Sequence, residues 1–181
     1  MTLPQAALTA LLYRYLAGFM DPFLSIEVAQ ALGWFLQVAS EPLPLHFSPT
    51  GPRSPTIGDL LGPVLVPHAD FLTNQEKSLA ETPLALKPGA WEEARAILAR
   101  HPEAAARVER VGVLIEGFES PSGLELLARA HWSATRDTTA RDVRDPQTDR
   151  GTRPPFTEHQ VSIARTHLHS HGWLNEARHD H

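Results

Sequence analysis

Histidine is the residue type that most suggests a chemical role in this chain. Ten histidines occur, and five of them lie in the last fifteen residues. His167 and His171 are four residues apart, so on a helix they share one face, at the spacing of two ligands for zinc or another borderline metal. A tetrahedral site needs further ligands and a buried second shell. We therefore expect a solvated terminus that binds nickel or zinc weakly, with no physiological metal site and no cofactor.

Three carboxylates near the middle of the chain are the next candidates for chemistry. Glu116, Glu119 and Glu125 are closely spaced, and a pair of carboxylates can perform acid–base catalysis. No activating partner accompanies them in the sequence. Glu119 lies just before an expected helix, where a negative charge stabilises the helix by roughly 0.3 to 1 kcal/mol. The sequence therefore favours a structural role for these residues.

The sequence motifs of common enzymes are also missing. The chain has no G-x-G-x-x-G, no phosphate-binding P-loop, no G-x-S-x-G and no H-E-x-x-H. It has no cysteine either, which excludes disulfides, thiolate ligands and a cysteine nucleophile. We therefore predict that the chain is not an enzyme.

Charge is unevenly distributed along the chain. The net charge is −5, and residues 1 to 86 hold seven acidic against three basic residues. An acidic region disfavours direct binding to nucleic acid, which depends on Lys and Arg beside phosphates, and it suits a basic protein partner. The chain lacks a signal-peptide pattern and an apolar run near the roughly 20 residues that span a bilayer. We expect a cytoplasmic protein without membrane contact.

Hydrophobic periodicity predicts that helices dominate the fold. The first helix spans residues 4 to 19, and a second begins with either Asp21-Pro22 or Ser25 as its cap. Further helices are expected over four regions: residues 88–100, 102–117, 121–132 and 157–172, the last capped by Thr157 and followed by an apolar pair, Trp173-Leu174.

Residues 41 to 73 have a different pattern. Leu43, Leu45 and Phe47 alternate as in a short strand, a brief helix could start after Ser54-Pro55, and residues 70 to 73 could form another strand. The predicted fold class is mainly α, or α+β, with about six helices and a small β-hairpin or short sheet near residues 43–73. We expect one domain, residues 1–174, with a flexible loop at 137–155 and a frayed tail at 175–181.

The segment IEGFESPSGLELLARAHW, from Ile115 to Trp132, predicts a corner between two helices. Gly117 ends the first helix, Ser120 caps the second and Pro121 is its first residue. His131 and Trp132 follow on the second helix, where we expect a half-buried core pair whose ring N–H groups find backbone acceptors. The corner is then a scaffold that holds two helices at a fixed angle.

Several stretches resemble the C-terminal toxin-binding region of DarG-type antitoxins, along nearly the whole chain. They are FLQVASEPL, LPLHF, a Gly51-Pro52 turn, LALKPGAWEEA, LIEGFESPSGLELLARAHW and a final GWL. The front half is also distantly similar to the SocA-like (Panacea) antitoxin domain. In this resemblance the hallmark residues form one set: Phe118, Glu119, Ser120, Pro121, Gly123, His131 and Trp132.

The resemblance implies a partner and a mechanism. In that family a macrodomain removes the ADP-ribose that the toxin DarT attaches to single-stranded DNA, and the C-terminal region binds DarT and occupies its DNA path. It therefore implies, for this chain, a DarT-like partner, DNA mimicry and binding without hydrolysis. The tyrosine-rich turn of the family is replaced here by Ser48 to Arg53. The expected contact residues are on this turn and on nearby acids: Ser48, Thr50, Gly51, Arg53, Asp59 and Asp70.

Two other functions remain open on the residues alone. The helix from Thr157 could belong to a winged-helix-like nucleic-acid-binding protein with a basic edge, although aspartates are interleaved with its arginines. The basic residues in question are Arg141, Arg144, Arg150, Arg153 and Arg165. A histidine-dependent metal protein using His167 and His171 is the other alternative.

Overall fold

A computed structural model of the chain describes residues 1–19, 24–67, 83–136 and 156–174. Seven helices and two short strands occur in this part of the chain. The chain divides into two compact units, residues 1–124 and 125–181, and each is described by itself. The predicted fold class, mainly α with one small antiparallel hairpin, is confirmed.

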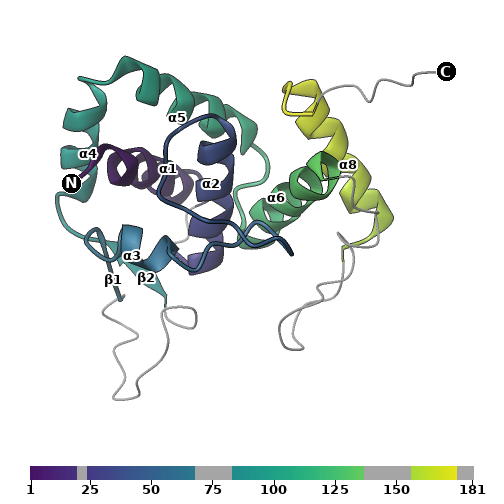
Figure 1. The fold of residues 1–181 in the computed structure, drawn as a ribbon, viewed down its shortest axis with the longest axis horizontal. Coiled ribbons are helices and arrows are strands. Elements are labelled where there is room, and N and C mark those ends of the chain that lie inside the picture. Colours follow the sequence, from purple (N-terminus) through teal and green to yellow (C-terminus); the bar gives the residue numbers. More distant parts are fainter. Residues whose placement is uncertain (20–23, 68–82, 137–155, 175–181) are drawn as a thin grey trace, which may run out of the picture. The chain divides into compact units, whose positions relative to one another are not determined.

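Helix α1 (Leu3–Phe19) is the central element of the first unit (Figure 1). It packs against α2 (Ile26–Val38), α4 (Ala90–Leu98) and α5 (Pro102–Leu114). Residues 6 to 12 are all buried, so most of the helix surface is covered by its neighbours. Burial on several sides at once explains why this helix can be rich in Ala and Leu around most of its circumference.

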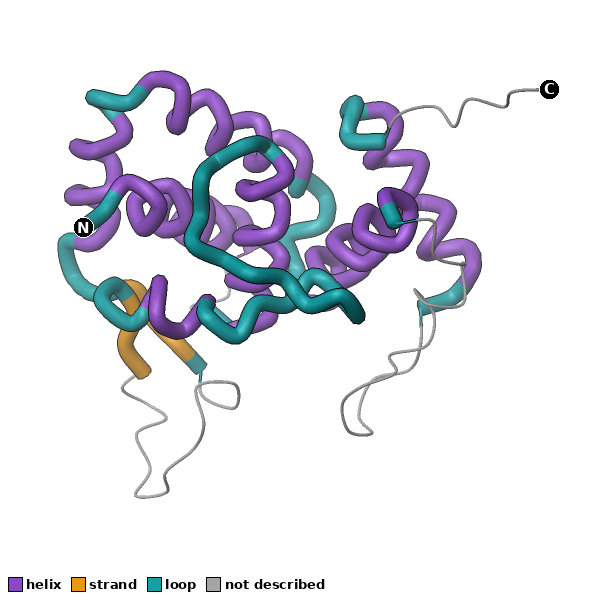
Figure 2. Tube along the Cα trace, in the orientation of Figure 1, coloured by secondary structure: helices purple, strands orange, loops and turns teal. Residues whose placement is uncertain are grey.

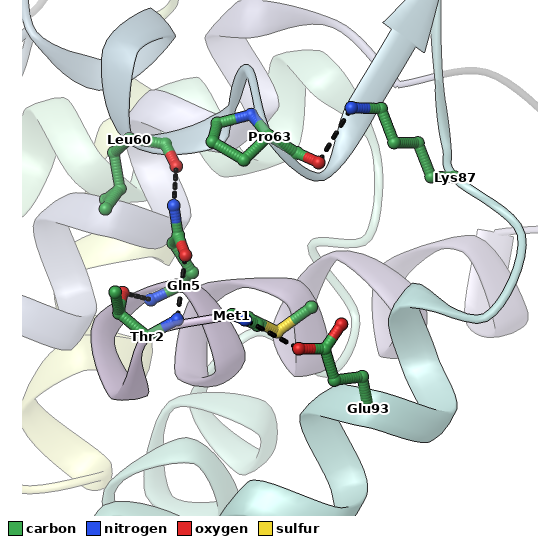
Figure 3. A network of polar contacts seen from close by, with 7 residues as sticks. All are labelled: Met1, Thr2, Gln5, Leu60, Pro63, Lys87 and Glu93. Carbon is green, nitrogen blue, oxygen red and sulfur yellow. Dashed lines mark hydrogen bonds and ion pairs between the residues drawn. The ribbon is translucent and has the colours of Figure 1, made fainter.

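The first turn of α1 is held by polar contacts on two sides (Figure 3). The backbone N–H of Thr2 donates to Oε1 of Gln5 at 2.8 Å, and that of Gln5 donates to Oγ1 of Thr2 at 3.4 Å, which is the reciprocal pattern of a capping box. Gln5 Nε2 also donates to the carbonyl oxygen of Leu60 at 3.1 Å. The amino group of Met1 lies 2.6 Å from Oε1 of Glu93, so this turn is tied to α4 as well.

Helix α2 begins as one of the two predicted caps requires. Ser25 is the N-cap, because its hydroxyl accepts the N–H of Val28 at 3.4 Å. At the other end Ser40 has a φ of 69°. The N–H of Glu41 then reaches the Leu36 carbonyl at 3.0 Å, and that of Ser40 reaches Gln37 at 3.0 Å, the two bonds of a Schellman motif. This motif turns the chain sharply and directs Glu41 inward.

The strand predicted at Leu43, Leu45 and Phe47 is wrong, since residues 42 to 48 form an irregular segment without ladder pairing (Figure 2). The alternation itself is real: Leu43 and Leu45 are buried, whereas Pro44 and His46 are exposed. Leu45 packs on α2 where Gly33 leaves room, 3.0 Å from the position that a Cβ there would take. The alternating pattern is therefore satisfied by packing on a helix rather than by a partner strand.

The hairpin lies further along the chain. Helix α3 (Ile57–Leu61) leads into β1 (Leu65–Pro67), which pairs antiparallel with β2 (Leu84–Leu86), Leu65 opposite Leu86. Leu84 also forms an isolated bridge with Leu24. Residues 70 to 73, the other predicted strand, lie outside the described residues, as do the predicted loop 137–155 and tail 175–181. The single-domain boundary at residue 174 stays a prediction.

Helix α6 (Pro121–Thr135) begins in the first unit and, from Glu125 on, belongs to the second. Helix α8 (Glu158–Ser170) starts at Thr157 with a complete capping box to Gln160. After the C-cap His171, Gly172 has a φ of 69°, and the N–H of Trp173 donates to the Leu168 carbonyl at 2.8 Å. Trp173 is 7% exposed, so the predicted apolar C-cap is confirmed.

Candidate functional site

The turn expected to contact a partner is compact and internally bonded. The N–H of Ser48 donates to the carbonyl of Arg53 at 2.7 Å, closing the turn. Inside it, the hydroxyls of Ser48 and Thr50 are 2.7 Å apart, and the N–H of Thr50 donates to Oγ of Ser48 at 3.1 Å. Four of the six predicted contact residues, Ser48, Thr50, Gly51 and Arg53, are thus brought together.

Ser54 fixes this turn to the helical core. Its N–H donates to Oε1 of Gln30 at 2.7 Å and its carbonyl accepts from Nε2 of Gln30 at 2.8 Å, so a side chain of α2 pairs with the backbone as a strand would. The Ser54 hydroxyl accepts the N–H of His46 at 3.2 Å. Trp34 also packs edge-on to Phe47, with ring centroids 5.1 Å apart. The turn is therefore presented in one shape before any partner binds.

Of the two carboxylates expected beside the turn, Asp59 and Asp70, the described residues include one. Asp59 is exposed on α3, whereas Asp70 lies outside the described residues. Within the turn itself the charged residue is Arg53. The described part of this surface therefore does not form the carboxylate-rich shape that a DNA-like surface requires.

The predicted helix corner is present in the first unit. Gly117 has a φ of 83°, which a glycine adopts without strain, and its N–H donates to Oε2 of Glu119 at 2.7 Å. Oγ of Ser120 accepts the N–H of Gly123 at 3.0 Å, so Ser120 caps α6 and Pro121 takes the first helical position. A Cβ on Gly123 would lie 2.7 Å from the Phe118 carbonyl oxygen, which explains the glycine there. These contacts support the structural role given to Glu119.

Replacing the cap should weaken the corner by a modest amount. We expect Ser120→Ala to lower the free energy of unfolding by about 1 kcal/mol, because the N–H of Gly123 loses its acceptor. Urea unfolding followed by circular dichroism measures this loss. Ser120→Asp keeps an acceptor at the same place and should retain most of the stability; an equal loss in both variants would mean that the cap is not the cause.

Ion pairs of Arg14, which the sequence does not reveal, join α1 to α5 and to the turn after it. Arg14 places Nη1 2.9 Å from Glu109 of α5 and Nη2 2.9 Å from Glu116, which lies just after the C-cap of that helix. The guanidinium lies directly over Gly112, where any Cβ would collide with it. The one available signal was a glycine inside a helix, which costs about 1 kcal/mol and therefore needs a reason.

This arrangement makes the effect of Gly112→Ala dependent on Arg14. In the native chain we expect almost no net change, because a helix-propensity gain of about 1 kcal/mol is offset by displacement of Arg14 from two exposed ion pairs. In an Arg14→Ala background the same substitution should stabilise by the full amount of about 1 kcal/mol. Thermal unfolding of the four proteins measures the difference, and an identical gain in both backgrounds would contradict the contact.

His131 in the second unit is buried rather than half-buried. It is 2% exposed, and Nε2 lies 3.1 Å from the carbonyl oxygen of Trp173, so the neutral ring donates its N–H to the cap that ends α8. Burial lowers the pKa of His131 from 6.5 to about 4, against a smaller raising effect of this hydrogen bond. The neighbouring Trp132 is 6% exposed. Both rings are core residues. The predicted backbone acceptor is confirmed for His131 but is wrong for Trp132, whose Nε1 is buried without a hydrogen-bond partner among the described residues.

The histidine pair of α8 stays on the surface. The His167 and His171 ring centroids are 4.1 Å apart, and Nδ1 of His171 lies 2.9 Å from the carbonyl oxygen of His167. The described residues contain no group of three or more His, Asp or Glu side chains placed to hold a metal ion. Across these same segments no helix combines the length and apolarity that a membrane crossing demands.

The winged-helix alternative finds little support in the described part of the second unit, which contains α8, most of α6 and no strand. Arg165 is the one arginine of the proposed basic edge that lies there, and its Nη2 is 3.4 Å from Oγ of Ser133. The other four arginines, at positions 141, 144, 150 and 153, lie outside the described residues.

No family model matches the sequence. A protein of Thermus aquaticus named "DNA ADP-ribosyl glycohydrolase" is 35% identical over 144 residues, which are 78% of this chain and 38% of that protein. Proteins of the same name from Mycobacterium tuberculosis and Mycobacterium bovis are each 33% identical over 153 residues, 76% of this chain and 43% of theirs. The chain thus spans about two fifths of the length of these curated relatives.

These relatives correct one prediction. The expectation that the chain is not an enzyme is wrong, because all three relatives are named for an enzymatic activity. The absence of short catalytic motifs does not exclude an enzymatic activity, since enzymes outside those motif families carry none of them. Over about three quarters of its length the chain is related to DNA ADP-ribosyl glycohydrolases, which supports its resemblance to DarG-type proteins.

Proposed function

We propose that this chain acts in a system that adds ADP-ribose to DNA and removes it, and that it neutralises a DarT-like ADP-ribosyltransferase by binding over its DNA site. The observation that carries the proposal is the similarity to DNA ADP-ribosyl glycohydrolases over 76% to 78% of the chain. The stretches that resemble DarG toxin-binding regions favour the more specific role, which is neutralisation of the transferase by binding.

The physical properties of the first unit are compatible with such binding. Its turn at Ser48 to Arg53 is held by Ser54 and Gln30, so little conformational entropy is lost when a partner contacts it. An ordinary complex buries about 800 Å² on each partner, which one face of a unit of this size can supply. The acidic residues of the first unit repel DNA and attract a phosphate-binding groove.

A transferase assay tests this proposal. The purified chain is titrated into a DarT-like transferase with NAD⁺ and a single-stranded oligonucleotide, and ADP-ribose transfer is measured. We expect transfer to stop near one chain per transferase, with inhibition that is relieved by more oligonucleotide but not by more NAD⁺. Unchanged transfer at a large excess of chain would refute neutralisation by binding.

The names of the relatives favour a second candidate function, which is hydrolysis of the bond between ADP-ribose and DNA. This activity is measured without any transferase, by incubating the chain with a purified ADP-ribosylated oligonucleotide and following release of ADP-ribose. Repeated turnover by the chain would establish this function. Because the two assays use different components, the result of one does not decide the other.

A further inference from the structure

Two histidines at the end of α8 have no part in the proposed function. His167 lies in the last turn of the helix and His171 is its C-cap, so the two residues are one turn apart. His171 is exposed and His167 is partly exposed. Imidazole nitrogens are ligands that zinc, copper and nickel accept. The pair is therefore a candidate metal-binding group that the fold leaves at the surface.

The ring of His171 is held in one tautomer. Its Nδ1 lies 2.9 Å from the carbonyl oxygen of His167 and 3.2 Å from Oγ of Ser170. A carbonyl oxygen can only accept, so Nδ1 of the neutral ring carries the proton and Nε2 carries the lone pair. Histidines that bind metals ordinarily donate one ring N–H to such an acceptor, which orients the other nitrogen toward the ion. His171 is therefore prepared to act as a ligand through Nε2.

His167 supplies the second nitrogen. Two nitrogens bound to one tetrahedral zinc ion, each at about 2.0 Å, are roughly 3.3 Å from one another. The ring centroids of His167 and His171 are 4.1 Å apart, with 36° between the ring planes. A modest rotation of the His167 side chain brings its nitrogen to the required spacing. One chain thus offers two of the four ligands of a tetrahedral zinc ion.

The remaining two ligands point to a second copy of the chain. The described residues contain no group of three or more His, Asp or Glu side chains placed around one ion, so the pair is not completed within them. A second copy brings an identical pair, and a two-fold axis through the ion generates a site of four histidines. Such an interface places the same part of α8 on both partners, so this surface must be able to meet its own copy.

The surface of α8 around the pair suits contact with its own copy. From Ser162 to Gly172 the exposed residues include no Asp, Glu, Lys or Arg, and Arg165 is partly buried with its Nη2 3.4 Å from Oγ of Ser133. Ile163 precedes His167 by one turn and is 49% exposed, the most exposed large hydrophobic side chain of the described residues. The other charged residues of the described second unit are Glu158 at the start of α8 and, on α6, Glu125, Arg129 and Arg136. Two copies of this surface therefore bring an aliphatic contact beside the ion and no exposed fixed charge of α8.

We infer that His167 and His171 bind zinc, or a similar borderline divalent ion, together with the same pair of a second copy of the chain. The ion joins two copies through α8, with Ile163 of each copy beside it. This inference is independent of the proposed function, because it needs neither a transferase nor ADP-ribosylated DNA. The sequence predicts only weak binding at a solvated terminus. The fixed tautomer of His171 and the uncharged surface around the pair are what the structure adds.

Zinc titration of the untagged full chain, after treatment with EDTA, tests this inference. We expect isothermal titration calorimetry to give one zinc ion for two chains, and sedimentation velocity to show a zinc-dependent doubling of mass that EDTA reverses. His167→Gln and His171→Gln should each lower the zinc affinity at least tenfold and abolish the doubling, because each removes two of the four ligands. One ion per chain without a change of mass, or no zinc binding at all, would overturn the shared site.

Other histidines of the chain provide matched controls. His169→Gln removes an exposed histidine that lies on another side of α8, and it should change neither the stoichiometry nor the mass. The double substitution His179→Gln with His181→Gln should also have no effect; a loss of zinc binding there would mean that the tail supplies ligands, and the inference would be wrong. Ile163→Lys keeps both ligands but adds a positive charge beside the ion, so it should weaken the dimer about tenfold. An unchanged dimer in this variant would contradict contact through α8. Without zinc, all variants should keep the unfolding midpoint of the native chain.

Discussion

Arg107→Met should lower the free energy of unfolding of the first unit by about 3 kcal/mol, which is a large effect for a residue outside the apolar core. The reason is Glu41, whose side chain is fully buried and whose Oε2 lies 3.0 Å from Nη1 of Arg107. Oε1 of Glu41 has no hydrogen-bond partner among the described residues, so the ion pair is what compensates the buried carboxylate. Removing the arginine leaves that carboxylate without its counter-charge.

A double substitution separates this mechanism from a general loss of packing. Glu41→Leu combined with Arg107→Met replaces the pair by apolar side chains and should recover most of the stability lost in Arg107→Met. The contact of Arg107 with the exposed Glu103, at 3.4 Å, should contribute only a few tenths of a kcal/mol. Urea unfolding of the three proteins measures these values. Equal stability of the single and double variants would show that the buried charge is not the cause.

Acid should destabilise the second unit through His131. The pKa of His131 in the folded chain is lowered from 6.5 to about 4, so the folded state prefers the neutral ring and the unfolded state binds the proton first. Stability is therefore complete above pH 6.5 and is lost as the pH falls from 6.5 toward 4. The full loss is about 3 kcal/mol, reached near and below the lower pKa. Hydrogen exchange of the α8 amides between these pH values measures it locally.

His131→Gln is the matched control for this effect. A glutamine side chain can donate an N–H toward the Trp173 carbonyl and does not titrate in this range. The variant should therefore lose the pH dependence while keeping a folded α8. If native chain and variant lose protection in parallel between pH 6.5 and 4, then other groups cause the acid sensitivity.

Local signals in the sequence located most of the helices, because each start depends on residues only three or four positions apart. The predicted caps Ser120 and Thr157 are confirmed, and of the two alternatives for the second helix, Asp21-Pro22 or Ser25, Ser25 is the cap. One capping residue was misplaced: α3 starts after Thr56, which makes no side-chain cap bond, rather than after Ser54. The buried Ser54 instead bonds Gln30 of α2, a contact between residues 24 positions apart that no local pattern encodes.

The strands also show that local sequence patterns do not encode contacts between distant segments. Alternation at Leu43, Leu45 and Phe47 indicates correctly that Leu43 and Leu45 are buried, although Phe47 is partly exposed. A strand also requires a neighbouring strand at the right distance. The pairing that does form joins Leu65 to Leu86, and each strand is only three residues long. Segments this short carry almost no periodic signal, so their position cannot be predicted from the sequence alone.

The candidate surfaces differ in how far they could be predicted. Proline and glycine indicate a loop at Ser48 to Arg53, but only the resemblance, in which a tyrosine-rich turn lies at this place, marks it as a candidate contact surface. The stack of Tyr13 on Trp91 could not be predicted, because the two residues are far apart in the sequence and only the fold brings their rings together. A half-exposed tyrosine in an amphipathic helix has the same sequence signature as a buried one.

The fit of Arg14 over Gly112 has a consequence for how this protein tolerates sequence variation. A larger residue at position 112 is compatible with the helix only if the side chain at position 14 becomes shorter or moves into solvent. In a library randomised at both positions and selected for folding, alanine at 112 should be enriched over glycine beside small residues at 14 but not beside arginine. The two positions, nearly one hundred residues apart, would therefore vary as a pair.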